Sequence, residues 1–539
     1  MKNIKYLIIP LVIILAFMMT ACNAEEEIDI PEDEIEETTE NYEAAEGGTL
    51  KLAVTRFNTL NPLLNKNYSL FQIHHLIYEG LISFDENMEI KSGLAQDWTI
   101  SPDGQNLQLT LKQGVSWHDG QPFTADDVIF TINLIKGNIG GNSVFKNSLQ
   151  HITDVRETQN GVINVTFSRP FSNALEVMTF PILPKHLFEG NNINKLQTLD
   201  FPLVGTGPFQ LENYETMRNI VLSKNENYWG QKPYIDKVDI MIVPDMEAQL
   251  MVFENGDIDL APSTSIDWAK YTEKKNVNVH EYVSHDYEFI GFNFRKPLLA
   301  DKNIRKAIAY SIDRHKLINN IYLGHGTIVD APIYPLSSIY DESQLQYGYN
   351  ANEAMNLLSA SGYTLNKEEN IMVNENGTPL ILNLLVSSED LLREKTAYFI
   401  QEELAKVGIK VDVEILGWDE LNTRLNRGNY DILLGGWRLS YITDLSFAFH
   451  SSQIGGSNFI YYGDDIMNGL LSSVIQAPNS TAKEEEYGKL QEHIIEELPY
   501  MSLFFKNASI LVRNKVKGEF KPNNYNLFNG IEDWFINTK

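Results

Sequence analysis

The sequence predicts an α/β fold with at least one pair of parallel strands. The chain has 539 residues, of which 43% are hydrophobic and 11% aromatic, so it is long enough to bury more than one core. Short strand-like runs alternate with helical ones, and residues 379–416 have the pattern strand, helix, strand. A crossover of this kind joins two parallel strands of one sheet. We therefore expect two or three domains of the α/β class.

The first 21 residues have the pattern of a secretory signal. Lys2 and Lys5 precede an apolar run, residues 6–19, and small residues follow it. The run is shorter than the roughly 18 apolar residues that a membrane-spanning helix needs. Cys22 comes next and is the only cysteine of the chain, so no disulfide can form within it. We expect residues 1–21 to be removed and the mature chain to lack a membrane span.

Residues 22–47 are expected to form a flexible acidic tether. Between Glu25 and Glu46 there are twelve acidic residues and no Lys or Arg. Their like charges repel one another, and few apolar side chains are present to offset the entropy of ordering. The whole chain has a formal net charge of −29, which argues against a nucleic-acid partner, because nucleic-acid binding depends on Lys and Arg neutralising phosphates.

The clearest structural unit lies in the second half of the chain. Residues 379–388 predict a buried strand, and residues 409–416 predict a strand with one buried face. Between them, residues 389–408 predict an amphipathic helix with Gly408 as its C-cap. In open sheets of this kind, ligands bind beyond the carboxyl ends of the strands.

A second amphipathic helix is predicted over residues 303–324. Its apolar residues recur at helical spacing and form one face. Asp301 is a candidate N-cap and Gly324 is a candidate stop. We therefore expect one continuous helix with a single buried face.

No catalytic, metal or cofactor motif is present. The sequence has no HExxH, GxSxG or GxxxxGK[ST] pattern. His74 and His75 are adjacent, so on a helix they point in different directions and form a poor pair of metal ligands. His118 and Asp119 could belong to a metal-dependent hydrolase, but we prefer a turn followed by a helix that Thr124 caps. We expect a protein that is not an enzyme and has no cofactor.

The order of short sequence blocks along the chain is typical of one protein family. The blocks are YEGL (78–81), LAQDW (94–98), HDGQPFTADDV (118–128), VGTGPF (204–209), NENYWG (225–230), NFRKPLLADKNIRKAIAYSIDR (293–314), GYNANEAMNLLSASGY (348–363), YDILLGGW (430–437) and LPYMSLFF (498–505). From Gly48 to Lys539 the chain resembles the large solute-binding proteins of peptide-type ABC importers. This family includes dipeptide-, oligopeptide- and nickel-binding proteins.

The resemblance implies a two-lobed periplasmic-binding-protein-like α/β fold of class II, with the ligand in the cleft between the lobes. Residues 48–285 would form the first lobe and include an extra α/β domain near residues 90–195. Residues 286–504 would form the second lobe, and residues 505–539 would return to the first. The lobes would close over a ligand by a hinge motion.

The resemblance also implies a place in the cell. Met19-Thr20-Ala21-Cys22 resembles the lipobox of bacterial lipoproteins, although leucine is more usual where Met19 stands. Cys22 would then be acylated and would anchor the protein on the outer face of the cytoplasmic membrane. This anchor suits a Gram-positive type of cell surface. The expected partners are a small solute and the membrane permease of an importer, and we expect a monomer.

Short peptides are the favoured ligand. An extended peptide offers unpaired backbone groups that a strand edge can bind whatever its side chains are. Trp418 and Trp437 stand where the related oligopeptide-binding proteins have ligand-lining tryptophans, although either could be an ordinary core residue. Asn293 lies where the family contacts the ligand, although it could equally shape a turn. Tyr68, which precedes the first block, completes this part of the predicted ligand site.

The segment after Trp437 departs from the enteric oligopeptide-binding proteins. Their aspartate that holds the peptide α-amino group is replaced by Ser440, and Arg438 would repel an ammonium. Asp444 is the acid that remains in the segment, as an amine anchor or as the cap of a helix. The alternatives therefore stay open. They are a nickel chelate, an opine or an oligosaccharide as the imported solute, or a surface peptide sensor or chaperone without import.

Overall fold

The computed structural model describes residues 44–137, 143–189, 196, 201–263, 266, 268–274 and 276–537. The predicted signal, Cys22 and the tether up to residue 43 lie outside the described residues. Within the described part of the chain, no helix combines the length and the apolar character needed to cross a membrane.

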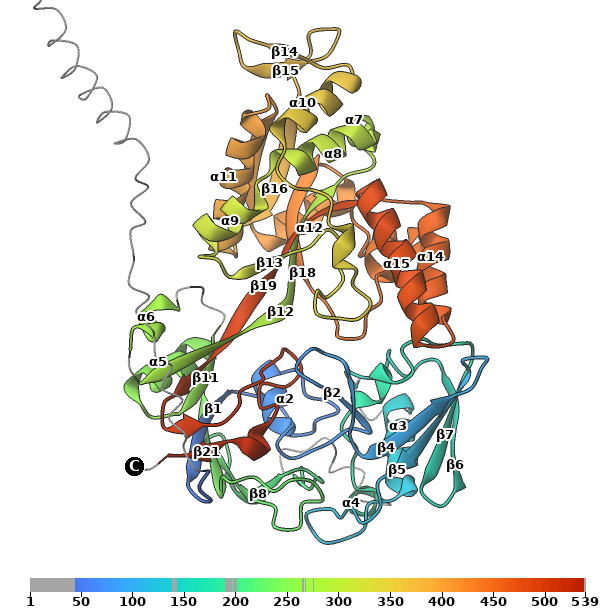
Figure 1. Ribbon diagram of the computed structural model, residues 1–539, viewed down its shortest axis with the longest axis vertical. Coiled ribbons are helices and arrows are strands. Elements are labelled where there is room, and N and C mark those ends of the chain that lie inside the picture. The colour runs from blue at the N-terminus through green and yellow to red at the C-terminus, as the bar shows by residue number, and fades with distance from the viewer. Residues whose placement is uncertain are drawn as a thin grey trace, which may run out of the picture. The chain divides into compact units, whose positions relative to one another are not determined.

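Residues 44–539 form one compact unit, and it folds as the predicted α/β type with two lobes (Figure 1). In chain order, the elements up to the first crossing strand are β1 (Thr49–Thr55), α2 (Tyr68–His74), β2 (Ile82–Phe84), β3 (Ile90–Ser92), β4 (Ala95–Ile100), β5 (Asn106–Leu111), α3 (Ala125–Lys136), β6 (Ile152–Gln159), β7 (Val162–Phe167), α4 (Lys185–Phe188), β8 (Phe209–Glu215), β9 (Asn219–Lys224), β10 (Lys237–Val243), α5 (Met246–Asn255), β11 (Leu260–Ser263), α6 (Ala269–Thr272) and β12 (Val277–Phe292).

The remaining elements build the second lobe and then return. They are α7 (Pro297–Ala300), α8 (Lys302–Ser311), α9 (Arg314–Ile321), β13 (Gly326–Ile328), α10 (Ala351–Ala360), β14 (Thr364–Asn366), β15 (Ile371–Val373), β16 (Ile381–Ser387), α11 (Leu391–Ala405), β17 (Lys410–Leu416), α12 (Trp418–Arg427), β18 (Ile432–Arg438), α13 (Ser446–Phe449), α14 (Asp465–Gln476), α15 (Ser480–Glu497), β19 (Tyr500–Arg513), β20 (Val516–Lys517) and β21 (Phe535–Ile536).

The first lobe holds two four-stranded sheets, in the orders β1-β10-β9-β8 and β4-β5-β7-β6. Buried residues of both sheets belong to one apolar cluster, among them Leu52 of β1 and Leu109 of β5. Trp534, near the C-terminus, is also buried in this cluster, so the end of the chain packs into the first lobe.

The second lobe is built on a sheet in the order β11-β19-β12-β18-β16-β17. The predicted crossover is confirmed, since β16 and β17 are parallel and α11 joins them. Asp390 starts α11 by accepting hydrogen bonds from the N–H groups of Leu392 and Arg393. The helix ends at Ala405, a little before the predicted cap, and Gly408 follows with a positive φ of 80°.

The single helix predicted over residues 303–324 is wrong, because the structure has two helices, α8 and α9. Asp301 caps α8 as predicted, but Asp313 caps a new helix by accepting from the N–H of Lys316. The break positions Arg314, which is 6% exposed and forms an ion pair of 2.6 Å with Asp330. A contact across the fold therefore overrides the local helical pattern.

The turn preferred at Asp119 is confirmed. The N–H of Gly120 donates to the carbonyl of Trp117, and Thr124 with Asp127 forms a capping box at the start of α3. The ring of His118 is hydrogen-bonded to the backbone of residues 205 and 207, so its polar atoms are used within the fold.

Two long strands, β12 and β19, run through both lobes (Figure 1). Val277 at one end of β12 packs in a first-lobe cluster, and Phe292 at the other end packs in the second lobe. Their antiparallel pairing is interrupted between Val283 and Tyr287, where residues 284–286 bulge out of register. The pairing shifts register again between Glu288 and Phe289, so residues 284–286 form the longer of two interruptions in the ladder that joins the lobes.

Candidate functional site

A pocket of about 430 Å³ lies where β18 ends, at the face of the second lobe that meets the first. We call it the cleft pocket. It opens at the carboxyl end of a parallel strand, which is the usual place for a ligand in such sheets. Its lining is His285, Pro332, Tyr334, Trp437, Arg438, Leu439, Ser440, Ile442, Thr443, Asp444, Leu445 and Phe447.

The segment after β18 bridges the two lobes. The ring of Tyr441 contacts those of Phe84 and Tyr525 in the first lobe, with centroids 5.6 and 5.2 Å apart. The carbonyl of Thr443 accepts a hydrogen bond of 3.2 Å from Nδ2 of Asn173. A ligand in the cleft pocket would therefore lie beside contacts that hold the lobes together.

In the cleft pocket the positive charge has a partner, whereas one negative charge has none. Arg438 donates to both carboxylate oxygens of Asp286, at 2.8 and 3.1 Å, and this pairing raises the pKa of the guanidinium. Asp444 forms no ion pair with any residue that the structure describes. The repulsion of an ammonium by Arg438, expected from sequence, is largely cancelled because Asp286 lies against it.

His285 contributes a neutral ring to the pocket. It is 3% exposed, and burial lowers its pKa to about 4. The ring stacks on Tyr334 with centroids 4.3 Å apart, and its Nδ1 has no partner among the described residues. This atom can therefore form a hydrogen bond with a ligand without adding charge.

The backbone of the same segment has unused donors. The N–H groups of Ser440 and Tyr441 form no hydrogen bond with the described part of the chain. The hydroxyl of Ser440 accepts from the N–H of Ile442, and Oδ1 of Asp444 accepts from the N–H of Ser446. Asp444 thus lies one residue before Leu445, the N-cap of α13, and this helix has no side-chain cap, so the capping alternative is not borne out. The second oxygen of Asp444 is left for another contact.

The structure brings four of the predicted residues together in this pocket, namely Trp437, Arg438, Ser440 and Asp444. Trp418 begins α12 at the carboxyl end of β17, two strands away from Trp437, and is 55% exposed.

Asn293 lies outside the cleft pocket. It is fully buried, and its amide donates to the carbonyls of Gly428 and Tyr430. Tyr68 lies on α2 in the first lobe and donates to the carbonyl of Asn524, and the charges of Arg438 and Asp286 act on its pKa, so it is close to the cleft pocket. The ligand-binding roles of these residues stay predictions.

Sequence reasoning missed His285, Asp286 and Tyr334. They lie about 100 to 150 positions before Trp437, and no motif marks them. The pairing of β12 with β18 is what brings Asp286 opposite Arg438. No cluster of three His, Cys, Asp or Glu suited to a metal ion occurs among the residues that the structure describes.

The family resemblance is confirmed by comparison with known proteins. The model of the bacterial extracellular solute-binding proteins, family 5 Middle, matches residues 89–458. The oligopeptide-binding protein AppA of Bacillus subtilis is 27% identical over 511 residues, which cover 91% of this chain and 92% of AppA. The nickel-binding periplasmic protein of Escherichia coli is 27% identical over 377 residues, which cover 67% of this chain and 69% of that protein.

Solved structures agree with this result. AppA of Bacillus subtilis in complex with a nonapeptide matches with a TM-score of 0.63 at 25% identity, covering 92% of this chain and 100% of that one. The substrate-binding protein CtaP of Listeria monocytogenes matches with a TM-score of 0.78 at 23% identity, covering 91% and 100%. Because the family model spans more than half of the chain, the protein belongs to the bacterial extracellular solute-binding proteins of family 5, which are binding proteins of importers and not enzymes.

Proposed function

We propose that the protein captures short peptides in the cleft pocket and delivers them to an ABC permease. The charge pattern of the pocket carries this proposal. Asp286 neutralises Arg438, and Asp444 remains as the unpaired charge of the lining. A negative pocket suits the α-ammonium of a peptide, because an ammonium that loses water needs a counter-charge.

The backbone and the apolar wall of the pocket support the same ligand. The free N–H groups of Ser440 and Tyr441 suit the carbonyls of an extended peptide, which have no partner of their own. Trp437, Phe447 and Tyr334 form the apolar wall, which adds affinity without demanding one side chain. The structure of the relative AppA holds a nonapeptide, and this likeness supports a peptide as the ligand of this chain.

The proposal includes the place of the protein in the cell. Acylation of Cys22 would anchor a monomer on the outer face of the cytoplasmic membrane, and the acidic tether would keep the lobes clear of the lipid. We place the lobe boundaries at residues 48–285 and 286–504, with residues 505–539 returning to the first lobe. Closure would occur by bending at residues 284–286.

Calorimetry with a free peptide and its N-acetylated form tests the ligand class. Asp444→Asn should weaken the free peptide by about 1.5 to 3 kcal/mol and the acetylated peptide only slightly. The amide oxygen of Asn can accept the hydrogen bond from the N–H of Ser446 as Asp444 does, so the folded state is preserved. Equal losses for both peptides would show that Asp444 does not hold the amine.

A thermal-shift screen of the wild type separates peptides from other solutes. A ligand that binds only the folded state raises its melting temperature. If nickel chelates, opines or oligosaccharides stabilise the protein and peptides do not, the proposed ligand class is wrong. Binding of peptides without uptake in cells would indicate a sensor or chaperone instead.

A further inference from the structure

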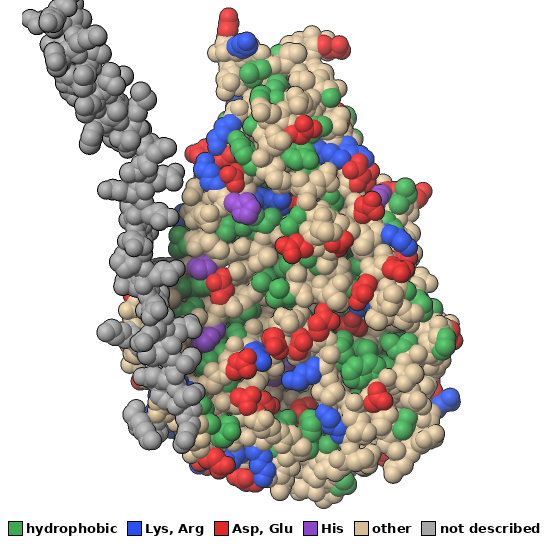
Figure 2. Space-filling model, viewed as in Figure 1, with side chains coloured by type: hydrophobic (Ala, Val, Ile, Leu, Met, Phe, Trp, Pro, Cys, Tyr) green, Lys and Arg blue, Asp and Glu red, His purple; other side chains and the backbone are tan. Residues whose placement is uncertain are grey.

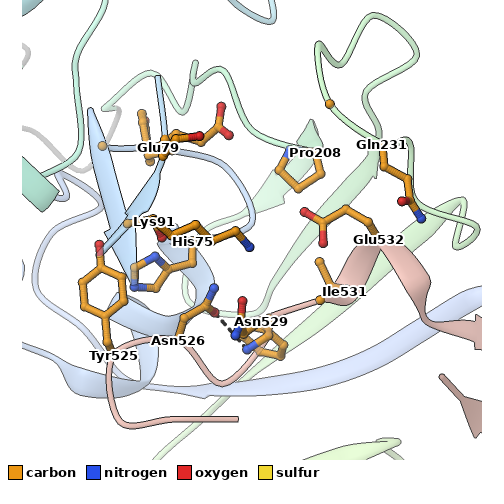
Figure 3. Close-up of a pocket in the computed structure, with 18 of the residues that line it drawn as sticks. His75, Glu79, Lys91, Pro208, Gln231, Tyr525, Asn526, Asn529, Ile531 and Glu532 are labelled. Atoms are coloured by element: carbon orange, nitrogen blue, oxygen red, sulfur yellow. Dashed lines mark hydrogen bonds between the residues drawn. The ribbon is translucent and has the colours of Figure 1, made fainter. Parts of the chain in front are cut away.

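A larger pocket lies within the first lobe and shares no lining residue with the cleft pocket. Its volume is about 480 Å³, which is in the range of small-molecule sites. It lies between α2, the β2–β3 hairpin, residues 228–231 and residues 519–533 near the C-terminus (Figure 3). The lower half of the molecular face in Figure 2 shows a hollow bordered by acidic and basic side chains. We call the pocket drawn in Figure 3 the first-lobe pocket.

Two lysines line this pocket without an ion pair. Nζ of Lys112 donates to the carbonyl of Gly93 at 2.6 Å and lies 3.9 Å from the ring centroid of Trp229. Lys91 is exposed at the rim of the pocket (Figure 3). Neither ammonium has a carboxylate oxygen within 4.0 Å among the described residues. Burial lowers the pKa of Lys112, so a bound anionic group would stabilise its charged form.

Two carboxylates line the same pocket without an ion pair. Glu79 accepts from the hydroxyl of Thr206 at 2.7 Å, from that of Tyr228 at 3.0 Å and from the indole N–H of Trp229 at 2.9 Å. These three donors are neutral. Glu532 has no cation within ion-pair distance in the described part of the chain, and burial raises its pKa. A bound cation would stabilise the ionised form of both carboxylates.

Three other charged groups of the lining form ion pairs with one another. Lys521 forms ion pairs with Glu519 at 3.0 Å and Glu86 at 3.6 Å. Asp533 accepts a hydrogen bond of 2.6 Å from the amide of Gln231. That amide is neutral, so two lysines (Lys91 and Lys112) and three carboxylates (Glu79, Glu532 and Asp533) of the lining have no ion pair with any described residue. The charges of Lys112 and Glu79 act on each other from beyond ion-pair distance, and that of Lys91 acts on Glu532.

Two histidines add polarity without charge. Burial lowers the pKa of His74 to about 3 and that of His75 to about 4, so both rings are neutral at physiological pH. Nδ1 of His74, which is 3% exposed, and Nε2 of His75 have no partner among the described residues. The pocket therefore holds buried polar atoms that a ligand could satisfy.

We propose that the first-lobe pocket binds a small zwitterion of the amino-acid class, with its carboxylate against Lys91 and Lys112 and its ammonium against Glu532 and Glu79. A molecule with one charge would leave two of the four groups unpaired, and a neutral molecule would leave all four. The volume of the pocket suits a free amino acid or a dipeptide, both of which have this chemistry. The site is separate from the cleft pocket, although Tyr525 lines it and touches Tyr441 of the cleft segment.

Calorimetry on the full chain tests this proposal with four probes: L-alanine, L-alanyl-L-alanine, N-acetyl-L-alanine and L-alaninamide. At least one of the two zwitterions should bind with a Kd of about 1 mM or tighter. The two analogues, each lacking one charge, should bind at least about tenfold more weakly. Comparison of the two zwitterions tells whether a free amino acid or a dipeptide is the natural ligand.

Variants assign the binding to this pocket. Lys91→Met changes an exposed side chain, so the fold should survive, and it should weaken the zwitterion by about tenfold or more. Glu532→Gln, which removes the proposed partner of the ammonium, should also weaken zwitterion binding by about tenfold or more. Glu226→Gln, which removes an exposed carboxylate that lines neither pocket, should leave zwitterion binding unchanged. The proposal is overturned if neither zwitterion binds, if a singly charged analogue binds as tightly as the zwitterions, or if Lys91→Met and Glu532→Gln both leave zwitterion binding unchanged.

Discussion

Replacement of Glu79 by Gln should remove a pH-dependent loss of stability. Burial raises the pKa of the Glu79 carboxyl from 4.5 to about 7, and its three neutral hydrogen-bond donors and the charge of Lys112 only partly oppose this effect. The folded state therefore holds the proton more tightly than the unfolded chain. The stabilisation that this proton provides is fully present below about pH 4.5 and is lost as the pH rises through about 7.

The size of the effect follows from the same pKa. Each pKa unit corresponds to about 1.4 kcal/mol, so the rise from 4.5 to about 7 means that full ionisation of Glu79 should destabilise the fold by about 3.5 kcal/mol, of which about 2.5 kcal/mol falls between pH 5 and 8. Gln can keep the three hydrogen bonds. Its carbonyl can accept from Trp229 and Thr206, and its amide can donate to the hydroxyl of Tyr228. The free energy of unfolding of Glu79→Gln should therefore be close to that of the wild type near pH 5 and higher than it near pH 8.

Urea unfolding of the wild type and the variant, at several pH values between about 5 and 8, measures this difference. Glu226→Gln is the control for the loss of one carboxylate, because its side chain is 70% exposed. The control should show no gain of stability that grows with pH. A constant difference between wild type and Glu79→Gln across this range would refute the reasoning, since it would mean that Glu79 does not exchange its proton there.

Three further predictions concern transport. Cys22→Ala should release the protein from the membrane or block its processing; retention in that variant, with no lipid on the wild type, would disprove the anchor. Trp437→Ala should weaken a short peptide by about tenfold, whereas Trp418→Ala should change its affinity less than about twofold; equal losses in calorimetry would contradict the assignment of the pocket. Lys483 forms a partly buried ion pair with Glu176 across the lobes, so Lys483→Met should weaken peptide binding by about 1 kcal/mol, and a double-mutant cycle with Glu176→Gln should show coupling.

The local sequence pattern was enough to predict those helices and strands that no distant contact alters. The crossover of β16, α11 and β17 was predicted because each segment has one clear period and the fold keeps it. The cap at Asp301 was predicted because a cap depends on the residues beside it. The break between α8 and α9 was not, since it serves the burial of Arg314 against Asp330.

In the candidate site, too, contacts between residues far apart in the sequence could not be predicted. The segment from Trp437 to Asp444 could be selected from sequence because it is continuous and carries the family pattern. The charge state of that segment could not be foreseen, because the partner of Arg438 is Asp286, 152 residues earlier. A single sequence gives no means of pairing two charges at that distance.

The bulge in β12 would link the proposed hinge to a bound ligand. On its second-lobe side, Glu288 is 2% exposed and accepts from Arg393 at 2.7 and 2.9 Å, and Lys506 of β19 lies 2.9 Å from it. This buried cluster would stiffen the strand on that side, so we expect the proposed bending at the bulge. Within the bulge, His285 lines the cleft pocket and Asp286 holds Arg438. A peptide bound in the proposed site would therefore contact the proposed hinge, and bending there would alter the position of the side chains that bind it.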